Sequence, residues 1–269
     1  NRIKEILASQ KLKTELREYL KNSIDTDFDR ADVYQLNRLE SAIILAPELE
    51  LNEVVGSLSE FINSQFPLLD VLLDSLSMLD SIDSTSTEKL IDMAETLVDL
   101  NFRTEQTLSD KPVLDDNNPE SRTYWRILKV LGNARNESAC QFLLRATGDY
   151  ASDKRDQAFK SLVKNQAHES PLKEEVKTRV SSALKDVSRD VRLTAIEAVG
   201  TLSIISELSE ILAFSQSKEV AVANQALNTL SELADSGHRD KVLKAVQTKL
   251  KTIHNPYFKE RLSTLMENL

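Results

Sequence analysis

The side chains that most often perform catalysis or bind metals are few and scattered in this sequence. It contains one cysteine, Cys140, and three histidines, His168, His238 and His254, and no histidine adjoins the cysteine. A cysteine nucleophile needs a neighbouring base, and a metal site needs several converging ligands. The spacing around Cys140 predicts a half-buried helical position, where a free thiol packs as a small hydrophobic group. We therefore predict no catalytic residue, no metal site and no cofactor, and a protein that is not an enzyme.

Composition excludes several other classes of protein. Only 5 of 269 residues are glycine and 6 are proline, and aromatic residues make up 5%. Sheets need turn residues, and phosphate-binding loops need glycine, so a β-rich fold and a P-loop enzyme are both disfavoured. No run of about 18 apolar residues is present, so no membrane span is expected. A single cysteine excludes an internal disulfide, and we expect a soluble, cytoplasmic protein.

Charge divides the chain into two unequal parts. Residues 1–118 carry 11 Lys and Arg against 24 Asp and Glu, whereas residues 119–269 carry 23 against 19. Between Arg38 and Lys89 there are ten acidic residues and no basic one. Such a surface repels a phosphate backbone, so we expect no nucleic-acid partner. Two interpretations remain open for the acidic part: a solvated surface, or a face that attracts a basic partner.

Helical spacing of apolar residues runs through the chain and predicts an all-α fold. The N-terminal part, residues 1–102, is an acidic helical region that we interpret as divergent helical repeats. Turn-forming sequences then mark residues 103–120 as a loop or boundary, and residues 121–269 form a repeat region. The predicted N-terminal helices cover residues 3–20, 29–46 with a stop at Pro47, 52–62, 67–81 and 85–100.

Four segments after the boundary resemble one another in the spacing of their apolar residues. When Ile127, Ala158, Ala195 and Ala223 are placed in register, the steps between segments are 31, 37 and 28 residues. A second amphipathic stretch follows each segment. Helix pairs that repeat at this period predict an α-solenoid, in which each pair buries its apolar face against its neighbours. The four segments are Tyr124–Ala134, Arg155–Asn165, Arg192–Leu202 and Val220–Leu230.

One of these segments carries a family resemblance. The run Asp190-Val191-Arg192, followed by Ala195, Ala198-Val199-Gly200 and Leu202, resembles the first helix of a HEAT repeat. Residues 153–158 and 130–134 match it in part, and the resemblance covers about residues 120–251. It implies a curved scaffold of antiparallel helix pairs whose second helices line the concave face.

The residues that carry the resemblance are expected to be structural. We expect the Asp153/Arg155 and Asp190/Arg192 pairs to serve helix starts and hydrogen bonds between repeats. Small residues such as Gly132 allow close helix packing. Tyr124 and Trp125 are expected to fill the junction between the two parts of the chain.

The function that fits this sequence best is a non-catalytic protein-interaction scaffold that binds a partner protein through the concave helical-repeat surface. The candidate partner-binding residues are Lys241, Lys244, Lys251 and Lys177, on two of the second helices, although a solvated helix surface also explains them. The alternatives are a HEAT-like lyase or enzyme-accessory protein and, less favoured, a nucleic-acid-binding or lipid-binding solenoid.

Overall fold

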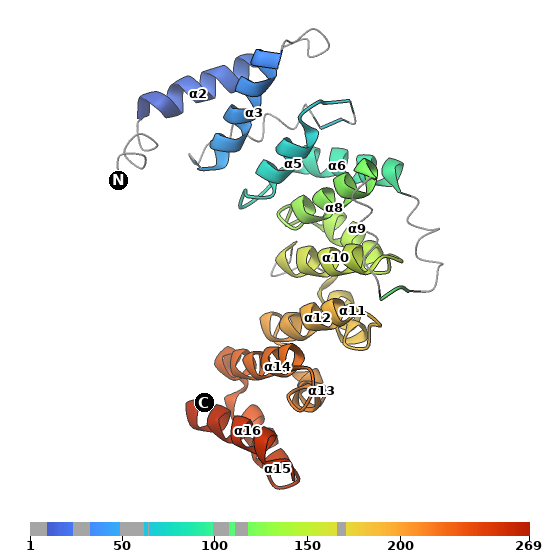
Figure 1. Ribbon diagram of the computed structural model, residues 1–269, viewed down its shortest axis with the longest axis vertical. Helices are drawn as coiled ribbons and strands as arrows, with labels where there is room; N and C mark the ends of the chain where they lie inside the picture. The colour runs from blue at the N-terminus through green and yellow to red at the C-terminus, as the bar shows by residue number, and fades with distance from the viewer. Residues whose placement is uncertain are drawn as a thin grey trace.

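The computed structural model describes residues 10–23, 33–48, 62–63, 65–98, 108–110, 118–165 and 171–269. Within these ranges the chain is helical and forms no β-strand, which confirms the prediction of an all-α fold (Figure 1). None of the described helices is both long enough and apolar enough to cross a bilayer.

The helices follow one another as pairs. The first helices of successive pairs are α5 (Leu69–Leu76), α8 (Pro119–Leu131), α10 (Ser152–Asn165), α12 (Arg189–Thr201) and α14 (Val220–Leu233). The second helices are α6 (Ser84–Leu97), α9 (Glu137–Ala146), α11 (Lys173–Ala183), α13 (Leu208–Phe214) and α15 (Arg239–Leu250). Two helices precede the pairs, α2 (Gln10–Ser23) and α3 (Val33–Glu48), and α16 (Pro256–Asn268) follows them. Short turns η2 (Ile205–Glu207) and η3 (Ala234–His238) lead into α13 and α15.

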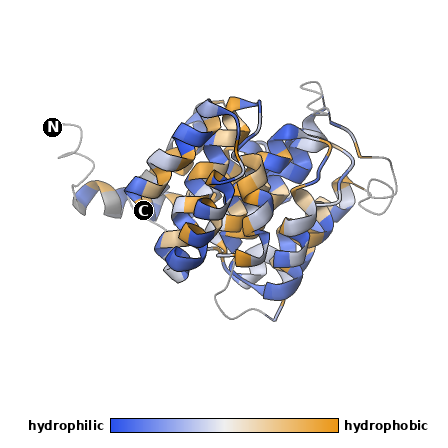
Figure 2. Cartoon of the chain, turned by 90° about the horizontal axis from the view of Figure 1, so that it is seen from below, coloured by the Kyte–Doolittle hydropathy of each residue, from blue (hydrophilic) through white to orange (hydrophobic). Residues whose placement is uncertain are grey.

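The pairs stack into an elongated row. Each first helix packs against the next one along the chain, from α5 through α8, α10 and α12 to α14. This packing crosses the predicted boundary, because α5 and α6 both pack against α8. Seen along the row, apolar residues gather toward the middle of the molecule and polar residues toward the outside (Figure 2). The row therefore has one continuous apolar interior between its two layers of helices.

The row bows toward its layer of first helices. In Figure 1 helices α2 and α16, at the two ends of the row, lie to the same side, and second helices such as α11 and α13 lie on the opposite, outer side. The expectation that second helices line a concave face is therefore wrong. Neighbouring first helices contact one another more closely than neighbouring second helices do, so the layer of first helices is the shorter, inner side of the row.

The four residues that the sequence places in register are buried, as predicted. Ile127, Ala158, Ala195 and Ala223 are all 0% exposed. Gly132, at the end of α8, brings the backbone of that helix against α10: a methyl group placed on it would lie 3.1 Å from the Cα atom of Ser161. Close approach of first helices thus depends on residues too small to hold them apart.

We expected helix α3 to stop at Pro47. It continues through Pro47 to Glu48 instead. Proline lacks the N–H that would bond to the carbonyl of Ile43, four residues earlier. The hydroxyl of Ser75, on α5, donates to that same carbonyl at 3.1 Å in a buried position. A side chain from a neighbouring helix therefore replaces the missing backbone donor, and the proline is accommodated in the last turn.

Other helix bounds differ from prediction by a few residues. The helix predicted over residues 67–81 is α5, which ends at Leu76 and passes into a turn. Helix α6 begins at Ser84, after this turn. The Asp83 carboxylate caps it by accepting from the N–H of Ser86 at 2.8 Å. Asn118 caps α8 in the same way, so that helix begins inside the predicted boundary. The helix predicted over residues 52–62 lies almost entirely outside the described residues.

Candidate functional site

The histidines and the cysteine show no reactive arrangement in the part of the chain that the structure describes. His168 lies outside that part, His238 is half-buried at the end of η3, and His254 is exposed. Among the described residues, no group of three or more His, Cys, Asp or Glu side chains is placed to hold a metal ion.

Cys140 lies on the inward face of α9 and is 3% exposed. Burial raises the pKa of its thiol to about 11, and the negative charges of Glu175 and Glu137 raise it further. A thiolate is the reactive form of cysteine, and at neutral pH this side chain keeps its proton. Cys140 therefore packs as a small apolar residue, as its spacing predicts.

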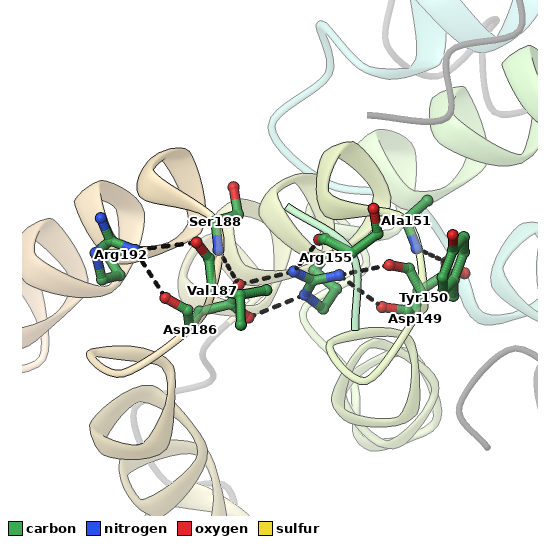
Figure 3. A network of polar contacts seen from close by, with 9 residues as sticks. Asp149, Tyr150, Ala151, Arg155, Asp186, Val187, Ser188 and Arg192 are labelled. Atoms are coloured by element: carbon green, nitrogen blue, oxygen red, sulfur yellow. Dashed lines mark hydrogen bonds and ion pairs between the residues drawn. The ribbon is translucent and has the colours of Figure 1, made fainter. Parts of the chain in front are cut away.

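Arg155 forms the most extensive polar network among the first helices (Figure 3). Its side chain is fully buried, and its Nε and Nη2 atoms donate to the two carboxylate oxygens of Asp186 at 2.9 and 2.7 Å. Nη1 donates to the carbonyls of Asp149 and Tyr150 at 3.0 and 2.7 Å, and Nη2 also reaches the carbonyl of Ser109 at 2.9 Å. One guanidinium thus joins the turn before α10, the turn before α12 and the segment between α6 and α8.

Arg192 repeats part of this arrangement one pair later. Its Nη1 donates to the carbonyls of Asp186 and Val187 at 2.9 and 3.1 Å (Figure 3), and its Nη2 lies 3.7 Å from a carboxylate oxygen of Glu219. The predicted role of the two arginines at helix starts and between repeats is confirmed. The neighbouring aspartates pair elsewhere: Asp153 with the buried Lys154, and Asp190 with Arg189.

The predicted partner-binding lysines do not form one site. Lys241 and Lys244 are exposed on α15, and Lys251 is exposed just after it. Lys177 lies on α11, where its amine pairs with Glu174 at 2.8 Å. Helix α13 separates α11 from α15 in the row (Figure 1), so Lys177 belongs to a different part of the surface.

A groove of about 770 Å³ lies between the second helices α9 and α11. Its apolar lining comes from Ile91 of α6, Phe142 and Leu144 of α9, and Leu172 at the start of α11. Charged side chains of both signs also line it, namely Arg145, Glu175 and Arg179. A mixed lining of this kind, apolar with a few polar groups, is typical of binding sites.

The two arginines of the groove are in different electrostatic situations. Arg145 stacks on the ring of Phe142, 5.4 Å from its centroid, and pairs with Glu95 of α6 at 2.6 Å. Arg179 donates from Nε to the hydroxyl of Thr147 at 2.6 Å. Burial lowers the pKa of Arg179, because a half-buried guanidinium loses hydration. Arg145 therefore has a carboxylate partner, whereas the bond of Arg179 is to a neutral hydroxyl.

No pattern in the sequence predicts this groove. It contributes residues from α6, α9 and α11, and no local motif unites them. One feature of the sequence is consistent with a half-buried Arg179: it lies between Val176 and Val180, both of which are buried. An arginine beside a buried apolar stripe is held at the edge of a packed interface rather than in open solvent.

Comparison with known proteins supports the fold alone. No family model matches the chain, and no curated protein matches it. Among solved structures it is similar to the crystal structure of an engineered protein, with a TM-score of 0.51 and 13% sequence identity. That match covers 94% of this chain and 67% of the engineered one. At this identity the likeness extends to the arrangement of helices and carries no function.

Proposed function

We propose that this chain is a HEAT-like α-solenoid that acts as a non-catalytic protein-interaction scaffold. The partner binds on the second-helix surface, in the groove between α9 and α11, rather than on a concave face. The observation that carries this proposal is the groove itself, about 770 Å³ with an apolar lining and charged groups beside it. Protein interfaces combine an apolar centre with polar groups around it in the same way.

The layered packing explains why such a groove persists without a ligand. Helices α9 and α11 each pack on first helices, and those first helices pack directly on one another. The inward faces of α9 and α11 are thus held by the apolar interior. The outward parts of the two helices stay apart and form the walls of the groove. A preformed site of this kind saves the partner much of the entropy that ordering a surface costs.

The test is selection of binding peptides on the intact chain. A display library of random 12-residue peptides is selected on the wild-type protein, and each binder is measured again on Ser182→Trp, which fills the groove from an exposed position on α11. The matched control is Thr248→Trp on α15. Both hydroxyls are exposed and donate to the carbonyl four residues earlier, at 3.0 and 2.8 Å, but Thr248 does not line the groove.

We expect peptides whose binding is lost in Ser182→Trp and kept in Thr248→Trp. A triple charge reversal, Lys241→Glu, Lys244→Glu and Lys251→Glu, separates the two candidate surfaces. Binders that are lost only in the triple variant would move the interaction to α15. If no peptide is sensitive to Ser182→Trp, the groove is not a docking site and the proposal is wrong.

A further inference from the structure

We propose that the groove between α9 and α11 recognises an acidic peptide segment, in which one carboxylate pairs with Arg179 and an adjacent apolar side chain packs over Leu144. This inference rests on the proposed function and specifies the chemistry of the partner. It depends on the geometry of Arg179, on the partners of the surrounding charges and on the distribution of charge along the groove.

Arg179 is held in place before any partner arrives. Its flanking residues Val176 and Val180 are buried, 1% and 0% exposed, which fixes this turn of α11. Its Nε donates at 2.6 Å to Thr147, which is 2% exposed and caps the C-terminus of α9. Among the described residues this is the one hydrogen bond of the guanidinium, so Nη1 and Nη2, the two ends of its fork, remain open to a ligand. A fork of this shape matches the two oxygens of a carboxylate.

Unlike Arg126 and Arg145, Arg179 has no acidic partner among the residues that the structure describes. Arg126 reaches Asp70 and Asp74 on α5, and Arg145 reaches Glu95 on α6. Within the described ranges no carboxylate lies within ion-pair distance of Arg179.

Asp186 is near enough to Arg179 to influence it electrostatically but is already occupied. Both of its carboxylate oxygens accept from Arg155, and Oδ1 also accepts from the N–H of Ser188 at 2.8 Å. The positive charge of Arg155 also repels that of Arg179 and so lowers the pKa of Arg179. Arg179 is thus a half-buried cation with no counterion among the described residues, and a carboxylate from a partner would supply one.

Charge along the groove limits how acidic the partner can be. Glu175 lies four residues before Arg179 on the same face of α11, a rise of about 6 Å along the helix. It lines the groove and repels a second carboxylate at that end. We therefore expect one Asp or Glu near Arg179, with a neutral or basic residue toward Glu175 and an aliphatic residue between them.

The experiment uses the peptides whose binding Ser182→Trp abolishes. Their affinity is measured for the wild-type chain, for Arg179→Gln and for Arg189→Gln. Arg189 is a matched control, because it is an arginine on the next first helix, its one ion pair among the described residues is with its neighbour Asp190, and it does not line the groove. We expect Arg179→Gln to weaken binding by about tenfold or more, and Arg189→Gln to leave it within about twofold.

A second measurement changes the peptide and leaves the protein unaltered, so a folding defect in Arg179→Gln cannot explain its result. Replacing the acidic residue of the peptide by its amide should weaken binding to the wild-type chain as much as Arg179→Gln does, and should cost nothing further in that variant. Groove-dependent peptides that contain no acidic residue, or that bind Arg179→Gln as well as wild type, would overturn the acidic specificity and leave the scaffold function standing. An absence of any groove-dependent peptide would instead overturn the proposed function.

Discussion

The first and second helices of this molecule differ in how closely they pack on one another. First helices pack on one another through small buried residues and are joined by fully buried polar groups such as Arg155. Second helices contact one another less closely, and between α9 and α11 they leave a groove that contains a cation with no counterion among the described residues. The comparison places the closest packing in the first layer, whereas the groove in which we propose that a partner binds lies in the second.

The largest effect is expected from Arg155→Met in the first layer. This change leaves Asp186, whose side chain is 6% exposed, as an unpaired buried charge, and it also removes the donor to three carbonyls. Breaking a buried pair in this way costs about 3–5 kcal/mol of unfolding free energy. Urea and thermal unfolding followed by circular dichroism measure the loss.

Arg192→Met is the control for that prediction. Its partner Glu219 has a side chain that is 49% exposed and lies 3.7 Å away, so solvent screens the pair. The expected loss is about 1 kcal/mol or less from the ion pair, with a further small cost for its carbonyl bonds. Equal losses for the two variants would show that burial does not distinguish these pairs.

A second prediction concerns pH and the inward face of α9. Cys140 has a pKa of about 11 in the folded chain, compared with an ordinary value of 9.0. Between these values the folded state keeps a proton that the unfolded state releases, so stability falls as the pH rises from about 9 to 11, by roughly 1 kcal/mol per pH unit. Cys140→Ala lacks this titration.

The measurement is the difference in unfolding free energy between wild type and Cys140→Ala at several pH values from 8 to 11. Other groups titrate alike in both proteins and cancel. A difference that stays constant with pH would mean that the thiol is not desolvated, and that α9 packs less tightly on the first layer than the structure shows.

The third prediction contrasts two glycines of the first layer. In Gly132→Ala the new methyl group meets the backbone of Ser161 at 3.1 Å, and a backbone cannot move aside without separating α8 from α10. We expect a loss of about 1–3 kcal/mol. In Gly200→Ala the methyl group meets the side chain of Glu232, whose exposed carboxylate end can turn away, which leaves a contact of 3.2 Å with its Cβ atom. Since alanine favours a helix by up to about 1 kcal/mol over glycine, this change should be neutral or stabilising.

Thermal unfolding of the two variants side by side measures this contrast. The pair tests whether close approach in the first layer depends on backbone contact at particular points. If Gly200→Ala were as destabilising as Gly132→Ala, the contact of Gly200 with Glu232 would be as rigid as the contact of Gly132 with Ser161.

The same difference between layers explains what the sequence could predict. The register of Ala158, Ala195 and Ala223 was readable because a buried small residue leaves a local, repeated pattern. The groove left none, because its walls come from separate helices. The missing counterion of Arg179 could not be read either, since it depends on Asp186 turning toward Arg155 instead. The continuation of α3 through Pro47 likewise depends on Ser75, which lies on another helix.

The smallest effect on stability is expected from Arg179→Gln. The change removes a hydrogen bond to Thr147, but it also removes the cost of keeping a half-buried charge without a counterion. These contributions oppose each other, so the unfolding free energy should change by no more than about 1 kcal/mol, in either direction. Arg155→Met and Arg179→Gln, unfolded under the same conditions, therefore compare the two layers directly. If Arg179→Gln lost several kcal/mol, Arg179 would be a structural residue like Arg155, and the division between a stabilising layer and a binding layer would fail at the residue on which it most depends.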